Sequence, residues 1–75
     1  MREETIFMPL LDEGVAVWAP VRAESLGEGL FLVLGPMPSD EKWQFGPGSI
    51  VRVRMHEFSG GQHDIAAFEI AALKH

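Results

Sequence analysis

The stretch LGEGLFLVLG, residues 26–35, decides the fold class of this chain. Gly27-Glu28-Gly29 predicts a turn, because glycine readily adopts the positive φ values that tight turns require. Leu30 to Leu34 is an uninterrupted apolar run, which predicts the most buried strand of a sheet. Gly35 then ends the run, so this stretch has the length of a strand between two turns.

The same alternation of glycine-containing turns and apolar runs continues in both directions along the chain. Glycine-containing turns recur about every 8–14 residues, with runs rich in Val, Ile, Leu and Phe between them, and no run shows a long helical period. This pattern is typical of a small antiparallel all-β domain. We expect strands at residues 5–11, 15–24, 30–34, 49–58 and 63–70. Five short, bent strands predict a partly open barrel, because closure protects strand edges that an open sheet of this size would expose.

Two segments are less regular. Pro36 and Pro38 forbid a helix before residue 39, after which Ser39 and Asp40 could cap a short helical turn near residues 39–43. Residues 65–73 fit a helix nearly as well as a strand, since Ile65, Phe68 and Ala72 would share one helical face. We favour a strand there, because the preceding glycine pair at residues 60–61 predicts a hairpin that leads into a partner strand.

Composition limits the functions that the chain can have. Its 75 residues allow a single domain, residues 1–75, with a thin core and no large internal cavity. A net charge of -5 argues against a general nucleic-acid binder and against docking on an anionic membrane. The apolar content of 47% predicts a homo-oligomer, most simply a twofold dimer, that covers the excess apolar surface. The absence of cysteine, of a signal-peptide pattern and of a long apolar run leads us to expect a cytoplasmic protein.

Two stretches resemble a known family. One is VWAPVRAE, residues 17–24, followed by Leu26-Gly27, and the other is DEKWQFGPGSIVR, residues 40–52. They resemble a family of very small bacterial proteins of uncharacterised function that look like SH3-like barrels. The resemblance covers roughly residues 10–58 and implies an SH3-like barrel. It implies no reaction, ligand or catalytic residue.

Aromatic residues and prolines form the first candidate binding surface. Trp18 points away from the Val17 and Val21 face by strand alternation, so it is either an anchor on a groove or a core residue under a loop. Trp43 and Phe45 lie beside the proline loop of residues 36–38, and aromatic residues among prolines form shallow grooves for extended peptides. The alternative is a small cluster that packs the loop down. We expect Trp43 to be mostly buried and Trp18 partly exposed.

A basic stripe forms the second candidate. Arg52, Arg54 and His56 alternate along one face of a strand, and Arg22 joins them if the second and fourth strands share that face. Such a stripe could bind a carboxylate, a phosphate or an acidic strand. The alternative, which we favour, is a solvated face paired with nearby acidic residues.

The hairpin at residues 56–64 is the third candidate, for a metal-dependent function. With residues 59–62 as the loop, Glu57 faces Asp64, and a bound cation would relieve the repulsion between these carboxylates. His56 and His63 do not converge in that register, so no zinc site assembles. No serine lies in a nucleophile elbow and no glycine-rich loop forms a phosphate cradle.

We therefore expect a non-enzymatic module without a cofactor that binds a protein or peptide partner. The alternatives are a nucleic-acid accessory protein that uses the arginines and a small metal-dependent enzyme at the His56/His63 hairpin. The candidate binding residues are Trp18, Arg22, Trp43, Phe45, Arg52 and Arg54.

Overall fold

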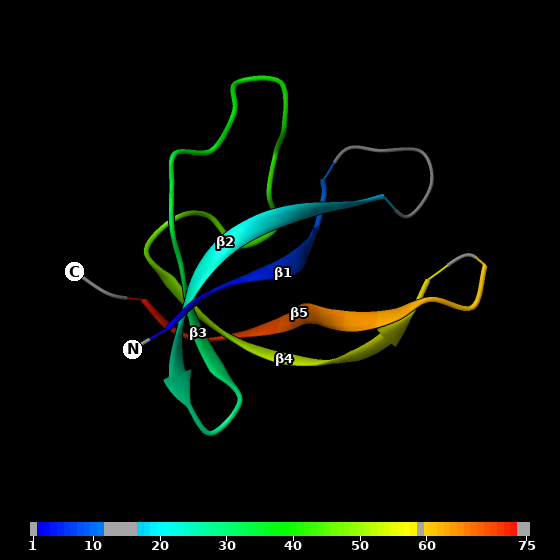
Figure 1. Ribbon diagram of the computed structural model, residues 1–75. Coiled ribbons are helices and arrows are strands. Elements are labelled where there is room, and N and C mark those ends of the chain that lie inside the picture. The colour runs from blue at the N-terminus through cyan, green and yellow to red at the C-terminus, as the bar shows by residue number, and fades with distance from the viewer. Residues whose placement is uncertain (1, 12–16, 59, 74–75) are drawn as a thin grey trace.

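The computed structural model describes residues 2–11, 17–58 and 60–73. It contains five strands, β1 (Glu3–Pro9), β2 (Trp18–Gly27), β3 (Leu30–Val33), β4 (Ser49–Glu57) and β5 (His63–Leu73). Figure 1 shows two hairpin arms, β1–β2 and β4–β5, which extend to the same side of the molecule, while the turn between β2 and β3 lies at the bottom of the view. The all-β class is confirmed, and the described residues contain no helix long and apolar enough to cross a membrane.

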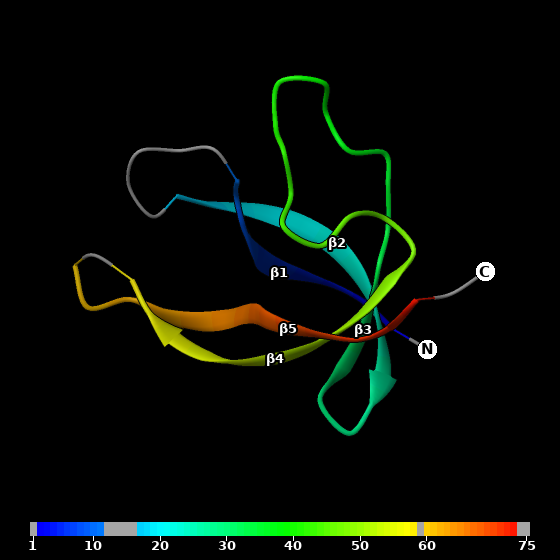
Figure 2. The ribbon, with the colours of Figure 1, turned by 180° about the vertical axis from the view of Figure 1, so that it is seen from behind.

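The strands form a closed ring in chain order, β1-β2-β3-β4-β5. Consecutive strands are antiparallel, and the ring is closed by a short parallel contact of β1 with β5, at Phe7 and Ala66. The expected barrel is thus present and fully closed, and it is compatible with an SH3-like fold. Figure 2, the view from behind, shows the long loop between β3 and β4 rising on the side of β2.

Strand alternation places the core inside this ring. Ile6 and Met8 of β1 are fully buried, while Phe7 between them lies on the opposite face. The core cluster consists of Ile6, Met8, Val21, Ala23, Phe31, Val33, Trp43, Phe45, Val51 and Ala67. Ile6 and Met8 are therefore covered within one copy of the chain and Phe7 is half-buried, which removes part of the reason for expecting an oligomer. The homo-oligomer itself stays a prediction.

The segment before β4 is irregular and contains no helix. The N–H of Glu41 donates to the carbonyl of Pro38 at 3.2 Å, so Ser39 and Asp40 form a β-turn where a short helical turn was considered. Trp43 then forms an antiparallel bridge with Leu10, just beyond β1. This bridge brings Trp43 and Phe45 into the core, with 8% of each side chain exposed.

The C-terminal segment is a strand, as expected. β5 runs to Leu73 and pairs with β4 along its whole length. Two register shifts interrupt this pairing, between Ile50 and Val51 and between Arg52 and Val53. They let β5 bend with the barrel, because an extra residue on one strand increases the local twist.

The register of the β4–β5 hairpin differs by one residue from our expectation. Glu57 faces His63 and His56 faces Asp64, so the predicted pair of opposed carboxylates, Glu57 and Asp64, was wrong. The N–H of Phe58 donates to the carbonyl of Gln62 at 2.6 Å, so Phe58 faces Gln62 rather than His63 and the loop is one residue shorter than expected. Each carboxylate therefore has an imidazole opposite it, and no repulsion exists there for a cation to relieve.

The backbone of Glu28, in the β2–β3 turn, adopts a strained conformation. Glu28 has a φ of 58°, in the left-handed region that costs most residues about 1–2 kcal/mol, whereas asparagine adopts it more readily. We expect Glu28→Asn to raise the free energy of unfolding by about 0.5–1 kcal/mol in urea titrations. Glu28→Ala removes the same charge but keeps the strain, so it should give no gain. An equal gain from both variants would show that charge, not backbone conformation, limits stability here.

Candidate functional site

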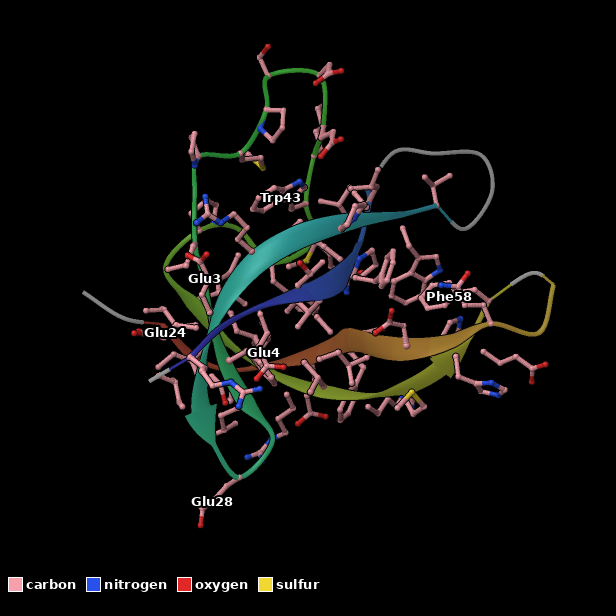
Figure 3. The ribbon with its side chains drawn as sticks, viewed as in Figure 1. Glu3, Glu4, Glu24, Glu28, Trp43 and Phe58 are labelled. Atoms are coloured by element: carbon pink, nitrogen blue, oxygen red, sulfur yellow. The ribbon has the colours of Figure 1, made fainter. Side chains whose placement is uncertain are left out.

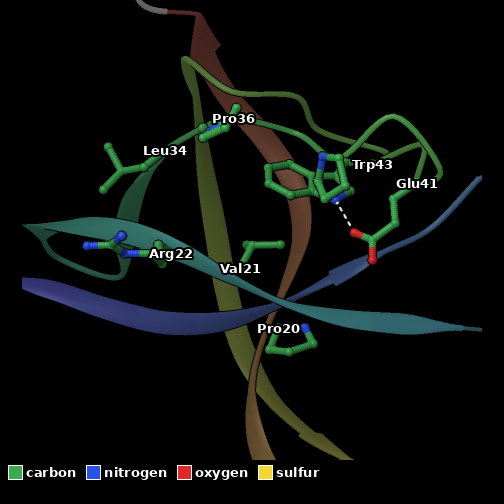
Figure 4. A pocket seen from close by; sticks show the side chains of 9 residues that line it. Pro20, Val21, Arg22, Leu34, Pro36, Glu41 and Trp43 are labelled. Atoms are coloured by element: carbon green, nitrogen blue, oxygen red, sulfur yellow. Dashed lines mark hydrogen bonds between the residues drawn. The ribbon is translucent and has the colours of Figure 1, made fainter.

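A shallow pocket of about 320 Å³ lies between β2 and the loop that precedes β4. Its volume is at the lower end of the range for sites that bind small ligands or a few side chains. Figure 4 shows Leu34 and Arg22 at one end and Trp43 with Glu41 at the other. The pocket is lined by Pro20, Val21, Arg22, Leu34, Gly35, Pro36, Pro38, Glu41 and Trp43.

Backbone hydrogen bonds hold the loop in place beside β2. The N–H of Leu34 donates to the carbonyl of Arg22 at 3.0 Å, and the N–H of Gln44 donates to the carbonyl of Pro9 at 2.9 Å. Gly35 packs closely on the next turn, since a Cβ there would lie 3.3 Å from the ring of Pro47. The pocket is thus anchored at both ends of the loop, although its rim is exposed.

The aromatic end of the pocket is fixed by a hydrogen bond. Trp43 Nε1 donates to Glu41 Oε1 at 2.9 Å, which satisfies the one polar atom of a buried indole. The opposite end carries Arg22, whose Nε donates to Glu3 Oε1 at 3.0 Å while Nη2 donates to the same oxygen. The pocket therefore combines an apolar middle with one carboxylate and one neutralised guanidinium.

Trp18 does not line this pocket but belongs to a separate aromatic cluster between the two arms. Its ring lies 4.8 Å from His56 and 5.6 Å from Phe58, and Phe58 in turn lies 4.8 Å from Phe7 and 4.7 Å from His56. All four side chains are half-buried. Figure 3 shows Phe58 between the ends of the β1–β2 and β4–β5 arms. The cluster thus joins the two arms, and Trp18 is half-buried while Trp43 is buried, as expected.

The other candidate residues lie in different surroundings. Phe45 is part of the core and does not line the pocket. Arg52 forms an ion pair with Glu69 at 3.1 Å, and the guanidinium carbon of Arg54 lies 4.9 Å above the ring of Phe68. Arg22 does not join them, because β3 separates β2 from β4 in the ring. Of the six candidates, the structure brings Arg22 and Trp43 together in one pocket.

The His56/His63 hairpin offers little for metal chemistry. His63 Nε2 lies 3.8 Å from Glu57 Oε1, while His56 stacks on Trp18. Within the part of the chain that the structure describes, no group of three or more His, Asp and Glu side chains could hold a metal ion.

Sequence reasoning missed two parts of these sites. Phe7 and Phe58 were not recognised as partners of Trp18, although both are large aromatic residues on the same strand faces as Trp18 and His56. Pro20 and Glu41 were not among the candidate binding residues, although both line the pocket. The available signal for Glu41 was its place two residues before Trp43.

Comparisons with models of known protein families, with curated proteins and with solved structures found no match for this chain.

Proposed function

We propose that this protein is a non-enzymatic interaction module that binds an extended segment of a partner protein in the Trp43 pocket. The observation that carries the proposal is the pocket wall, in which three prolines surround a rigidly held tryptophan. Rigid apolar side chains bind with little loss of conformational entropy, which favours them at peptide-binding surfaces. An apolar or proline side chain of the partner would pack on Trp43 between Pro36 and Pro38.

The pocket also contains the motif residues that resemble the small bacterial SH3-like proteins. Pro20, Arg22, Glu41 and Trp43 all belong to the two matching stretches and all line the pocket. We therefore extend the proposal to membership of that family. The shared residues would then be those of a binding surface rather than of the core alone.

The test is a nuclear magnetic resonance titration with decaproline as the probe. Decaproline is preorganised in an extended helix, so it tests the groove without a folding cost. We expect the Trp43 indole N–H resonance to shift in a saturable way, together with the amides of Leu34, Gly35 and Met37. A glycine–serine decamer, which has neither rigidity nor apolar side chains, should leave these resonances unchanged.

Two variants distinguish specific binding in the pocket from nonspecific association with the protein surface. Pro38→Ala removes a pocket wall and should weaken binding about fivefold or more, the loss expected of an interface anchor. Met55→Ala removes an exposed apolar side chain that does not line the pocket and should change affinity less than about twofold. Equal losses from the two variants, or no saturable shift with decaproline at millimolar concentration, would remove the pocket as a peptide site.

A further inference from the structure

A second surface lies on the face of β4 and β5 around Arg54, which we call the Arg54 face. It is defined by Arg52 and Arg54 of β4 and by Phe68 and Glu69 of β5. Arg54 is exposed, and Phe68 is 36% exposed. None of these residues lines the Trp43 pocket, so the Arg54 face is independent of the function proposed above.

A bulge directs Phe68 toward Arg54. Arg52 faces Glu69 and Val53 faces Ala67, so Phe68 has no residue opposite it on β4. The extra residue of a bulge changes the direction of its side chain, and bulges often serve this purpose. Here the ring of Phe68 lies 4.9 Å below the guanidinium carbon of Arg54.

The contact with Phe68 leaves the N–H donors of Arg54 available, since the guanidinium makes no hydrogen bond or ion pair among the described residues. A guanidinium stacks through its flat face, whereas its N–H donors point outward in the plane. Arg22 and Arg52 pair with Glu3 and Glu69, but within the described residues Arg54 has no carboxylate partner. Arg54 is therefore a held guanidinium whose donors face solvent, which is the arrangement that binds a carboxylate with two parallel hydrogen bonds.

The charge on this face decides the class of partner. Glu69 neutralises Arg52, so Arg54 provides about one uncompensated positive charge. The net charge of -5 repels strongly charged polyanions such as nucleic acids more than a ligand with a single carboxylate. The exposed ring of Phe68 adds an apolar contact beside the guanidinium. These features fit a protein segment in which one acidic residue has apolar neighbours.

We propose that the Arg54 face binds an extended segment of a partner protein through one carboxylate on Arg54 and an adjacent apolar side chain on Phe68. The carboxylate accepts from the outward N–H groups of Arg54. The apolar side chain covers the part of the Phe68 ring that stays exposed.

The experiment is an amide chemical-shift titration of the full chain with the capped peptide Gly-Leu-Asp-Leu-Gly. We expect saturable shifts at residues 52–54 and 66–69. The same peptide with Asn in place of Asp should bind at least about tenfold more weakly, as should Arg54→Gln with the original peptide, because each change removes a charge-assisted hydrogen bond. Arg2→Gln is the matched control: it removes an exposed arginine that belongs to neither the Trp43 pocket nor the Arg54 face and should leave the affinity within about twofold.

Other outcomes would overturn the proposal. If the peptide caused the same amide chemical-shift changes in Arg54→Gln, the guanidinium would not be the group that binds the carboxylate. Tighter binding of an oligothymidylate than of the peptide, lost in Arg54→Gln, would assign the face to nucleic acid instead. Light scattering that shows a dimer disrupted by Arg54→Gln would assign it to a second copy of the chain.

Discussion

Replacing Trp43 with alanine should lower the free energy of unfolding by about 3–5 kcal/mol, the range for deleting a large buried aromatic side chain. Trp43 is only 8% exposed, packs in the core cluster and donates its indole N–H to Glu41. The total stability of a small domain is commonly about 5–15 kcal/mol, and 75 residues place this one near the lower end. Urea denaturation followed by far-ultraviolet circular dichroism should therefore find the variant partly or wholly unfolded at 25 °C.

The control for this prediction is the second tryptophan. Trp18→Ala removes an indole of similar size that is half-buried, so it should cost clearly less than Trp43→Ala. If Trp18→Ala were the more damaging change, the aromatic cluster rather than the barrel interior would be the main source of stability.

Replacing Phe58 with alanine should cost about 2–4 kcal/mol, because Phe58 contacts three rings at once. Its ring centroid lies within 5.6 Å of those of Phe7, Trp18 and His56. Aromatic pairs contribute about 0.5–1.5 kcal/mol each beyond area burial, and the half-buried ring adds a part of the usual 1.5–3 kcal/mol for a phenylalanine. Hydrogen exchange should show faster opening of the β1–β2 and β4–β5 arm ends, whereas the amides of β3 keep their protection.

Phe68 provides the matched control, since it is the same residue type on β5 and touches none of these rings. Phe68→Ala should cost less than about 1 kcal/mol, because more than a third of the side chain is already exposed. Similar losses from the two variants would mean that the cluster does not join the arms.

The positions of the strands and the burial of Trp43 could be predicted from the chain alone. Gly27, Gly29 and the apolar run from Leu30 locate β3, and Pro36 with Pro38 exclude a helix in the loop that follows. These signals are local, because turn chemistry and period-2 alternation act over two to five residues. Residues 12–16, where the expected second strand begins, lie outside the described residues.

The different partners of the arginines in the basic stripe could not be predicted in the same way. Alternation correctly put Arg52 and Arg54 on one face, but their partners depend on the bulge at Phe68. A bulge changes which β5 residue faces each β4 residue, and bending of the closing barrel sets where it occurs. The hairpin register at His56 was missed for a related reason, since the length of its loop is set by the Phe58 to Gln62 contact.

The all-β class follows from local patterns in the sequence, which also name the residues that supply aromatic and basic groups. How those groups combine depends on the tertiary structure. Trp43 lines a pocket with Pro20 and Arg22. Trp18 packs in a cluster with Phe58, and Arg54 lies over the ring of Phe68. The reason is the separation along the sequence of the residues that interact. Turns and alternation are fixed by neighbouring residues, whereas each of these contacts joins segments at least 14 residues apart, which meet only when β4 pairs with β5 or when the barrel closes.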